Sequence, residues 1–477
     1  MTFTSALFAL FLPVVFATYC SVSDRSRWLV LLVASYGFYA SFESPSLLLV
    51  LALVSLISYV GGLWLGTKRK HVGRGSILGL CTISCLGILF FTKYLPHFQV
   101  IQHYGLLSTI TSIGVSYYTF QAISYLIDVY MEVQEPETHL GYFALYMAYF
   151  PKLLQGPIER AHHLLPQLRT PYRFNYDNVR SGLLLFAGGL FCKVVIAERV
   201  ARYVNSVYDN VHGHAGVTLI LATYCYAVQI YCDFAGYTDM ARGTARLFNI
   251  DLTVNFNHPY VASSVADFWR RWHISFSRWI LDYIFKPLQL KWRNWGTLGT
   301  ATALLITFLA SGIWHGASCG FVIWGLLHGI YLASSVFYRP YQKKLHAAMG
   351  VGKSGWYRVV QVFFTFNLVS FAWIFFRANT LRDALYVVKN LATLSGWMPS
   401  EGVRLFLSAQ ILLGEGIHNI VPLLLTMIVV LAGSREWLGR VQQRAAFVRW
   451  PIYLALSYAI VMFGVWSAGP RFVYFAF

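Results

Sequence analysis

Charged side chains are scarce in this chain, and acidic ones are the scarcest. Asp, Glu, Lys and Arg make up 12% of the 477 residues, and only 19 residues are acidic. A soluble globular protein carries roughly a quarter charged residues, so the composition excludes a soluble protein. Hydrophobic residues reach 57% and the mean hydropathy is +0.55, which predicts an integral membrane protein. No polar stretch is long enough to fold separately, so we expect a single domain over residues 1–477.

Motifs of several other protein classes are missing. The chain has no P-loop, no dinucleotide-binding fingerprint and no Gly-x-Ser-x-Gly elbow, which argues against ATP-driven transport, and we expect no bound cofactor. Its seven cysteines lie in or beside apolar runs without zinc-type spacing to histidines, so we interpret them as packing groups and predict no metal site. Met1–Cys20 lacks the basic n-region and the cleavage site of a signal peptide, so we expect a first membrane helix there.

The basic residues do not form an extended basic domain. They give a net charge of +18 but fall in short tracts between apolar runs, such as Lys68–Arg74 and Lys286–Arg293. This distribution is typical of cytoplasmic loops that meet anionic lipid headgroups. It argues against nucleic-acid binding.

Apolar runs of about 20 residues, enough to cross a bilayer, recur along the chain and predict about 10 to 12 crossings. Residues 139–180 and 250–296 are too polar or too short to span, so we expect re-entrant or in-plane helices there, lining a central funnel. The predicted fold is an all-α polytopic membrane protein, a ring of transmembrane helices around a central tunnel. The apolar runs lie near residues 3–20, 28–42, 46–66, 77–95, 106–127, 180–198, 216–236, 297–315, 319–337, 357–376, 417–433 and 450–468.

The segment after residue 264 has the pattern of one amphipathic helix at the membrane interface. Ser264 is the expected N-cap, and Asp267 precedes Arg271 by four residues, in ion-pairing register. His273 falls at the edge of the aromatic face, neither clearly buried nor clearly exposed. The aromatic face comprises Trp269, Trp272, Phe276 and Trp279, with Arg271 and Arg278 opposite.

Two histidines beside tryptophans carry the strongest chemical signal. An imidazole titrates near neutrality and can accept a proton from a hydroxyl or thiol, and it is costly in hydrocarbon unless it has a function. His315 lies between Gly312 and Gly316, whose small size lets a ligand or backbone approach the ring. Alternatively, His315 is a hydrogen-bonded contact between helices. His273 either lies among arginines that hold a phosphate or serves as an interfacial anchor.

Other residues are candidates for binding the substrate or its donor. His328 follows His315 by thirteen residues, with glycines between them. Asp233 and Asp239 are carboxylates in an apolar segment, so we expect each to pair with an arginine such as Arg242 or to orient a histidine. A structural role is the preferred interpretation of both. The complete candidate set is Trp314, Arg270, Arg271, Trp272, Asp233, Asp239 and His328.

Six segments of the chain match motifs of a known family, in the same order. They are Ser112–Tyr118, Phe150–Pro157, Tyr231–Met240, Asp267–Ser275, Ser311–Ala317 and the tail Phe472–Phe477. Through them the chain resembles the membrane-bound O-acyltransferases over nearly its whole length. The most similar branch is the bacterial one typified by the membrane subunit of alginate O-acetylation, although Lys286–Trp295 replaces a Gly-Gly-x-Arg-like loop of that branch.

The resemblance implies a specific reaction and site. It implies a helical ring around a tunnel, with His315 as the catalytic residue at its waist and His273 near the cytoplasmic entrance. It also implies an O-acetyltransferase of the bacterial inner membrane that passes acetyl from acetyl-CoA, a cytoplasmic thioester, to a polysaccharide such as alginate or cellulose. A histidine would act as general base or carry the acyl group, and arginines within 270–293 would meet the donor's phosphates. The implied partners are an SGNH-like extracytoplasmic acetyltransferase, a polysaccharide synthase or export complex, and membrane lipid.

Other functions remain open from the sequence. Within the family, D-alanyl transfer to teichoic acid and peptidoglycan O-acylation are the alternatives. From another class, a secondary transporter would use His273 and His315 as proton-relay groups, although the inverted repeats common in such folds are not detectable. A structural subunit of a synthase complex is the third possibility, and both histidines would then be silent on mutation.

Overall fold

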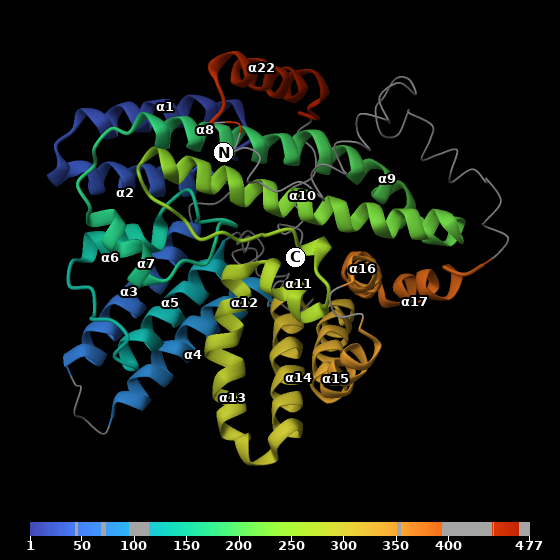
Figure 1. Cartoon of the computed structure of the whole chain (residues 1–477). Helices are drawn as coiled ribbons and strands as arrows, with labels where there is room; N and C mark the ends of the chain where they lie inside the picture. The colour runs from blue at the N-terminus through green and yellow to red at the C-terminus, as the bar shows by residue number, and fades with distance from the viewer. Residues whose placement is uncertain are drawn as a thin grey trace, which may run out of the picture. The chain divides into compact units, whose positions relative to one another are not determined.

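The computed structural model describes residues 1–42, 46–67, 73–94, 114–350, 354–393, 441 and 443–466. This part of the chain is almost entirely helical and contains no strand (Figure 1). Eight of its helices are long and apolar enough to span a membrane. The prediction of an all-α polytopic membrane protein is therefore confirmed. The predicted crossing at 417–433, part of that at 106–127, most of the basic tract at 68–74 and the tail at 472–477 lie outside the described residues.

The chain divides into two compact units, each built from separate segments. Unit 1 comprises Met1–Leu190 and Tyr237–Thr253, and unit 2 comprises Phe191–Gly236 and Val254–Phe477. Helix α10 (Val217–Leu247) belongs to unit 2 up to Gly236 and to unit 1 beyond it.

Unit 1 contains the first eight helices. Small residues allow these helices to pack closely: a Cβ on Gly62 of α3 would lie 2.6 Å from the Tyr125 ring of α5. The chain enters α1 at Ser5, whose side chain accepts a hydrogen bond from the Phe8 N–H at 3.3 Å. The helices are α1 (Ala6–Ser21), α2 (Asp24–Ala40), α3 (Ser46–Thr67), α4 (Arg74–Lys93), α5 (Val115–Tyr130), α6 (Leu140–Ala148), α7 (Ala161–Arg169) and α8 (Tyr176–Phe191).

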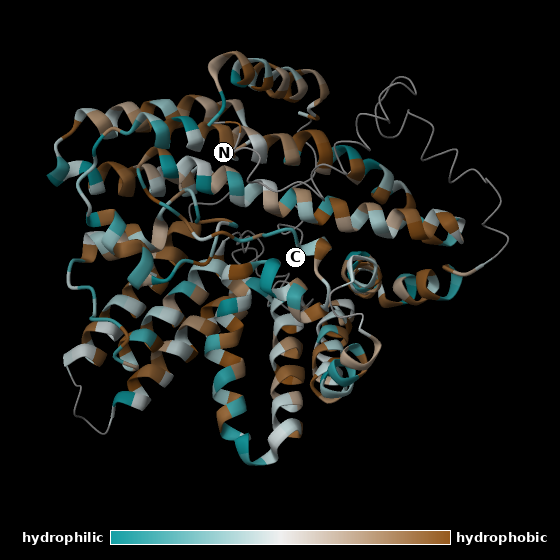
Figure 2. Cartoon of the chain, viewed as in Figure 1, coloured by the Kyte–Doolittle hydropathy of each residue, from teal (hydrophilic) through white to brown (hydrophobic). Residues whose placement is uncertain are grey.

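Unit 2 carries both histidine motifs. In Figure 1, α13 and α14 run side by side as a hairpin, and Figure 2 shows hydrophilic residues gathered at its tip. The helices are the π-helical turn η3 (Cys192–Ala197), α9 (Glu198–Tyr208), η4 (Val211–Gly213), η5 (Pro259–Val261), α11 (Val265–Arg271), α12 (Ile274–Ile280), the π-helical turn η6 (Leu281–Phe285), α13 (Lys286–Lys291), η7 (Arg293–Trp295), α14 (Gly296–His315), α15 (Cys319–Met349), α16 (Gly355–Arg377), α17 (Leu381–Asn390) and α22 (Ala446–Phe463).

The segments predicted not to span differ in the length of their helices. Within residues 139–180, α6 and α7 have nine residues each. Within 250–296, α11 has seven residues, but α12, η6 and α13 follow one another without a break over residues 274–291. A helix of nine residues is roughly 14 Å long, less than half the thickness of the hydrocarbon core. Helices α6, α7 and α11 are therefore too short to cross alone, whereas the continuous stretch 274–291 rises roughly 27 Å. The re-entrant or in-plane orientation of both segments stays a prediction.

The single amphipathic helix predicted after Ser264 is wrong. The chain forms two helices, α11 and α12, with the backbone of His273 in the left-handed region at φ 42° between them. The break has a non-local cause: the Arg271 carbonyl accepts from the Asn257 N–H, and the Ile274 N–H donates to the Asn255 carbonyl, both at 2.9 Å. These bonds take backbone groups that a continuous helix would use itself.

Local features of this segment are confirmed. The Ser264 hydroxyl caps α11 by accepting from the Asp267 N–H at 3.1 Å. Asp267 pairs with Arg271 at 3.0 Å. The aromatic face is buried within the protein rather than exposed to lipid. His273, predicted at the edge of this face, is only 1% exposed.

Candidate functional site

His315 is the last residue of α14, and its imidazole is enclosed by aromatic rings. The whole His315 residue is 4% exposed. The ring centroid lies 4.6 Å from Trp314, 4.9 Å from Trp324 of α15 and 5.1 Å from Phe376 of α16. The Trp324 and Phe376 rings meet it edge-on, at 88° and 76°. Three helices of unit 2 therefore fix the position of this imidazole.

His273 is held by a second, polar arrangement. Its Nδ1 lies 3.3 Å from the Asn255 side-chain oxygen, which also accepts from the Ser275 N–H at 3.1 Å and the Ser275 hydroxyl at 2.8 Å. Because that oxygen accepts from Ser275, Nδ1 takes the role of donor, and the lone pair of the neutral ring resides on Nε2. Burial lowers the pKa of His273 from 6.5 to about 3, so the ring is neutral at physiological pH.

One aromatic ring links the two histidines. The Phe276 ring lies 5.1 Å from His273 and 6.2 Å from His315. Phe276 also stacks on Trp314 at 4.6 Å and 21°. The structure thus brings the two histidines predicted from separate motifs into contact with a single side chain, Phe276.

His328 has a different proton arrangement. The Trp269 Nε1–H donates to His328 Nδ1 at 3.2 Å, so the neutral ring carries its own proton on Nε2. That nitrogen has no hydrogen-bond partner among the described residues. The ring packs 5.1 Å from Trp324, which also contacts His315. His328 therefore packs against a ring that also contacts His315, and it presents no basic nitrogen to a substrate.

The candidate arginines lie apart from the buried rings. Arg270 and Arg271 both pair with Asp267, at 3.5 Å and 3.0 Å, and the Arg270 side chain is largely exposed. Trp272 is buried, with Phe256 and Trp373 rings at 5.0 Å and 5.2 Å. The Arg270 side chain is accessible to an anionic group and that of Arg271 is partly so, whereas Trp272 is a packing residue.

The structure shows an ion pair for each of the two aspartates. Asp239 lies 3.6 Å from Arg242, as predicted. Asp233 pairs with a lysine. Its carboxylate contacts the ammonium of Lys193, which also meets Glu198 at 2.6 Å. The lysine was not predicted, because Lys193 lies forty residues earlier in the chain and no local spacing connects the two.

Two residues of the site were missed by sequence reasoning. Asn255 orients His273 but stands in no recognisable motif. Lys193 did leave a signal, because a lysine inside the apolar run 180–198 requires a partner. The partner itself became visible only in the folded chain.

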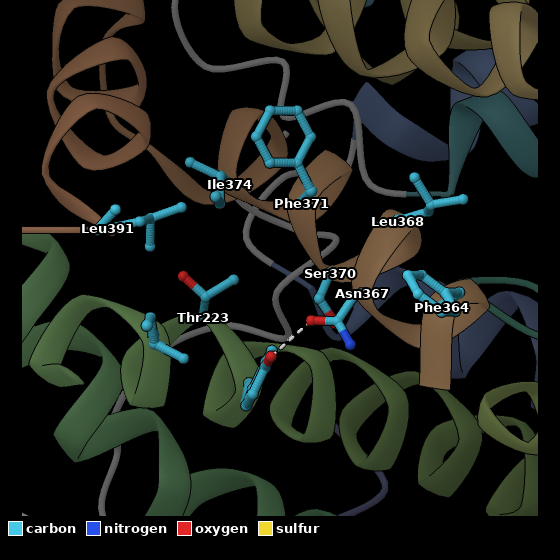
Figure 3. A pocket seen from close by; sticks show the side chains of 11 residues that line it. Thr223, Phe364, Asn367, Leu368, Ser370, Phe371, Ile374 and Leu391 are labelled. Carbon is cyan, nitrogen blue, oxygen red and sulfur yellow. Dashed lines mark hydrogen bonds between the residues drawn. The ribbon is translucent and has the colours of Figure 1, made fainter. Parts of the chain in front are cut away.

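A separate cavity of about 480 Å³ lies between α10, α16 and the end of α17 (Figure 3). Its lining is mostly apolar and includes Phe364, Leu368 and Phe371. The Tyr224 hydroxyl donates to the Asn367 side-chain oxygen at 2.6 Å within it. None of the predicted site residues lines this cavity, so it is distinct from the histidine site.

The histidine site offers side chains that can transfer a proton. Among the described residues, no group of three or more His, Cys, Asp or Glu side chains is placed to hold a metal ion. The available elements are a neutral His273 with a basic Nε2 and a caged His315. An imidazole so placed can take a proton from an attacking hydroxyl or thiol, or carry an acyl group briefly.

Comparison with known proteins gives the same reaction class. The model of the membrane-bound O-acyltransferase family matches residues 132–377. A peptidoglycan O-acetyltransferase of Helicobacter pylori is 33% identical over 443 residues, covering 83% of this chain and 80% of that protein. A probable alginate O-acetylase of Pseudomonas aeruginosa is 33% identical over 490 residues, covering 99% and 88%. A teichoic acid D-alanyltransferase of Bacillus subtilis is 26% identical over 319 residues, covering 65% and 79%.

Proposed function

Because this chain belongs to the membrane-bound O-acyltransferase family, we propose that it moves acetyl groups across the bacterial inner membrane for O-acetylation of an extracytoplasmic polysaccharide. The chain is a multi-pass membrane protein and an acyltransferase. The donor in this proposal is acetyl-CoA. The single observation that supports the proposed site is the Phe276 ring, against which both His273 and His315 pack.

The proposed chemistry is one acyl transfer. A histidine takes the proton of the attacking hydroxyl or thiol, whose oxygen or sulfur forms a bond to the acetyl carbonyl carbon. The carbon–sulfur bond of the thioester breaks, and coenzyme A leaves as its thiol with the proton. His315 is the proposed catalytic base or transient acyl carrier. Asn255 keeps the basic nitrogen of His273 on Nε2, where a second proton transfer can take place.

The proposed donor and partners follow from the compartments in which coenzyme A and the polymer are found. Coenzyme A stays inside the cell and a polymer stays outside, so the acetyl group has to cross the membrane between them. Arg270 and Arg271 are exposed enough to meet the donor's phosphates. We propose an SGNH-like extracytoplasmic acetyltransferase as the acceptor protein, together with a polysaccharide synthase or export complex. Peptidoglycan and an alginate-like polysaccharide are equally supported as the glycan, since the two relatives named for them are both 33% identical to this chain.

D-alanyl transfer is the alternative within the family. The D-alanyltransferase relatives are 26% identical and cover 60 to 65% of this chain, below the 33% of the O-acetylating relatives. Purified protein in vesicles should therefore be labelled, or should turn over, with radioactive acetyl-CoA. Labelling only by an aminoacyl carrier protein would replace the acetyl proposal with D-alanylation.

The catalytic assignment is tested by His315→Ala. Removing a general base lowers the rate by about 10²–10⁴-fold, so acetyl transfer should fall by that factor while polymer length and export stay normal. His212→Ala is the matched control, because His212 is an exposed histidine of the same unit that lies 3.2 Å from Asp383. Full acetylation in the His315→Ala protein would overturn the assignment.

A further inference from the structure

A buried cluster of charged side chains lies in unit 2, outside the aromatic rings that surround His315. Lys193 is 6% exposed and Asp233 is 2% exposed. The Lys193 ammonium contacts the Asp233 carboxylate and lies 2.6 Å from that of Glu198. Lys193 and Asp233 both belong to helices apolar enough to span the membrane. Charges at such positions are costly and persist where they serve a function.

The lysine stands in an irregular helical turn that is tied to the C-terminal helix. Residues Cys192–Ala197 form a π-helical turn, a feature that frequently occurs at functional sites. The Val194 carbonyl accepts a hydrogen bond from the Val465 N–H at 2.9 Å. Arg199 Nε donates to the Phe463 carbonyl at 2.7 Å. The end of α22 therefore fixes the turn that carries Lys193.

The next residue after Asp233 touches the histidine site. The Phe234 ring meets the His273 ring edge-on, at 4.7 Å and 88°. It also lies 5.0 Å from Phe256, which follows Asn255 in the chain. The position of the unit 2 part of α10 thus determines where the Phe234 ring contacts the His273 ring.

We infer that Lys193 and Asp233 are positioning residues: their ion pair fixes α10 so that Phe234 holds the His273 imidazole against Phe276 and Asn255. The inference rests on the proposed function only in assigning His273 to acyl transfer. Neither residue of the pair touches the reacting atoms. An ion pair that only stabilised the fold would change the amount of folded protein without changing the turnover of each folded molecule.

The first test measures turnover per folded protein. Asp233→Asn and Lys193→Gln should each lower kcat by about 10²-fold with little change in KM, because a displacement of about 1 Å near the chemistry costs that much. The double variant should lose no more than the worse single variant, since paired residues act as a unit. Asp209→Asn is the control, as it removes an exposed carboxylate 3.2 Å from Arg377 and should keep wild-type kcat. A wild-type kcat in folded Asp233→Asn protein would overturn the inference.

The second test does not depend on catalysis. In full-length protein with isotope-labelled histidine, the His273 ring resonances should shift in Asp233→Asn and stay in place in Asp209→Asn. Phe234→Leu covers the case in which the charge variants fail to fold, because it leaves the ion pair intact and removes only the ring against His273. Unchanged His273 resonances in Phe234→Leu would refute the inference. Shifted resonances with no acyl transfer even in the wild-type protein would refute the proposed function alone.

Discussion

Helices α14 and α15 cross at two glycines, and adding one methyl group there should disable the site. A Cβ on Gly325 would lie 2.4 Å from the Phe308 carbonyl oxygen and 2.9 Å from the Gly312 Cα. A Cβ on Gly312 would lie 2.4 Å from the Phe321 carbonyl oxygen. Ordinary contacts begin at 3.4 Å, so Gly325→Ala requires the backbones to separate by about 1 Å.

That separation acts directly on the aromatic rings around His315. Gly325 follows Trp324, and Gly312 precedes His315 by three residues on the other helix, so the 4.9 Å contact between the two rings opens. An active-site displacement of about 1 Å costs about 10²-fold in rate. Overpacking of this kind also costs about 1–3 kcal/mol of stability. We expect Gly325→Ala to show both effects.

The assay compares acetyl transfer per folded molecule in vesicles with thermal unfolding followed by tryptophan fluorescence. Gly79→Ala in α4 is the matched control, since nothing lies within 4 Å of its Cβ position and alanine favours a helix over glycine. The control should keep wild-type rate and stability or gain slightly in stability. Wild-type turnover in Gly325→Ala, even with reduced stability, would refute the view that this crossing sets the position of the imidazole.

Protonation, hydrogen bonding and surface charge give three more expected outcomes. Burial lowers the pKa of His273 from 6.5 to about 3, so the unfolded chain binds this proton first and folding weakens as the pH falls from 6.5 toward 3. Asparagine tolerates the left-handed backbone at this position, so the unfolding temperature of the His273→Asn protein should fall less on acidification than that of the wild-type protein. Equal slopes of unfolding temperature against pH would contradict this. Trp269→Phe leaves His328 Nδ1 without its donor and should cost about 1–3 kcal/mol in denaturant unfolding; an unchanged midpoint would contradict the assigned tautomer. Asp282→Asn removes an exposed pair with Lys286 at 2.7 Å and should change stability by less than about 1 kcal/mol, so a larger loss would show that the pair is not a surface contact.

The sequence predicted the features that depend on local patterns. Composition and apolar runs predicted a polytopic helical protein, and short-range spacing predicted the Ser264 cap and the Asp267–Arg271 pair. The helix break at His273 was not predictable, because the hydrogen bonds that cause it come from residues 255–257. A helical wheel treats the segment in isolation and cannot include such competition for backbone groups.

The candidate site followed the same division. Both histidines were identified from their motifs, since a polar ring among tryptophans in an apolar chain is informative by itself. Their shared contact with Phe276 depends on how α12 and α14 pack, which no spacing in the sequence encodes. The Lys193 partner of Asp233 was missed for the same reason.

Helix α14 also sets the distance between its own start and the His315 ring. Its first seven residues, 296–302, are mostly Gly, Thr and Ala, whose character suits the headgroup layer, and apolar residues follow. From Thr302 to His315 an untilted helix rises about 20 Å, about two-thirds of a hydrocarbon core of about 30 Å. In the proposed transfer, a donor that binds at the Trp295 end of α14 would therefore have to reach about 20 Å along the helix axis from Thr302 to meet the imidazole.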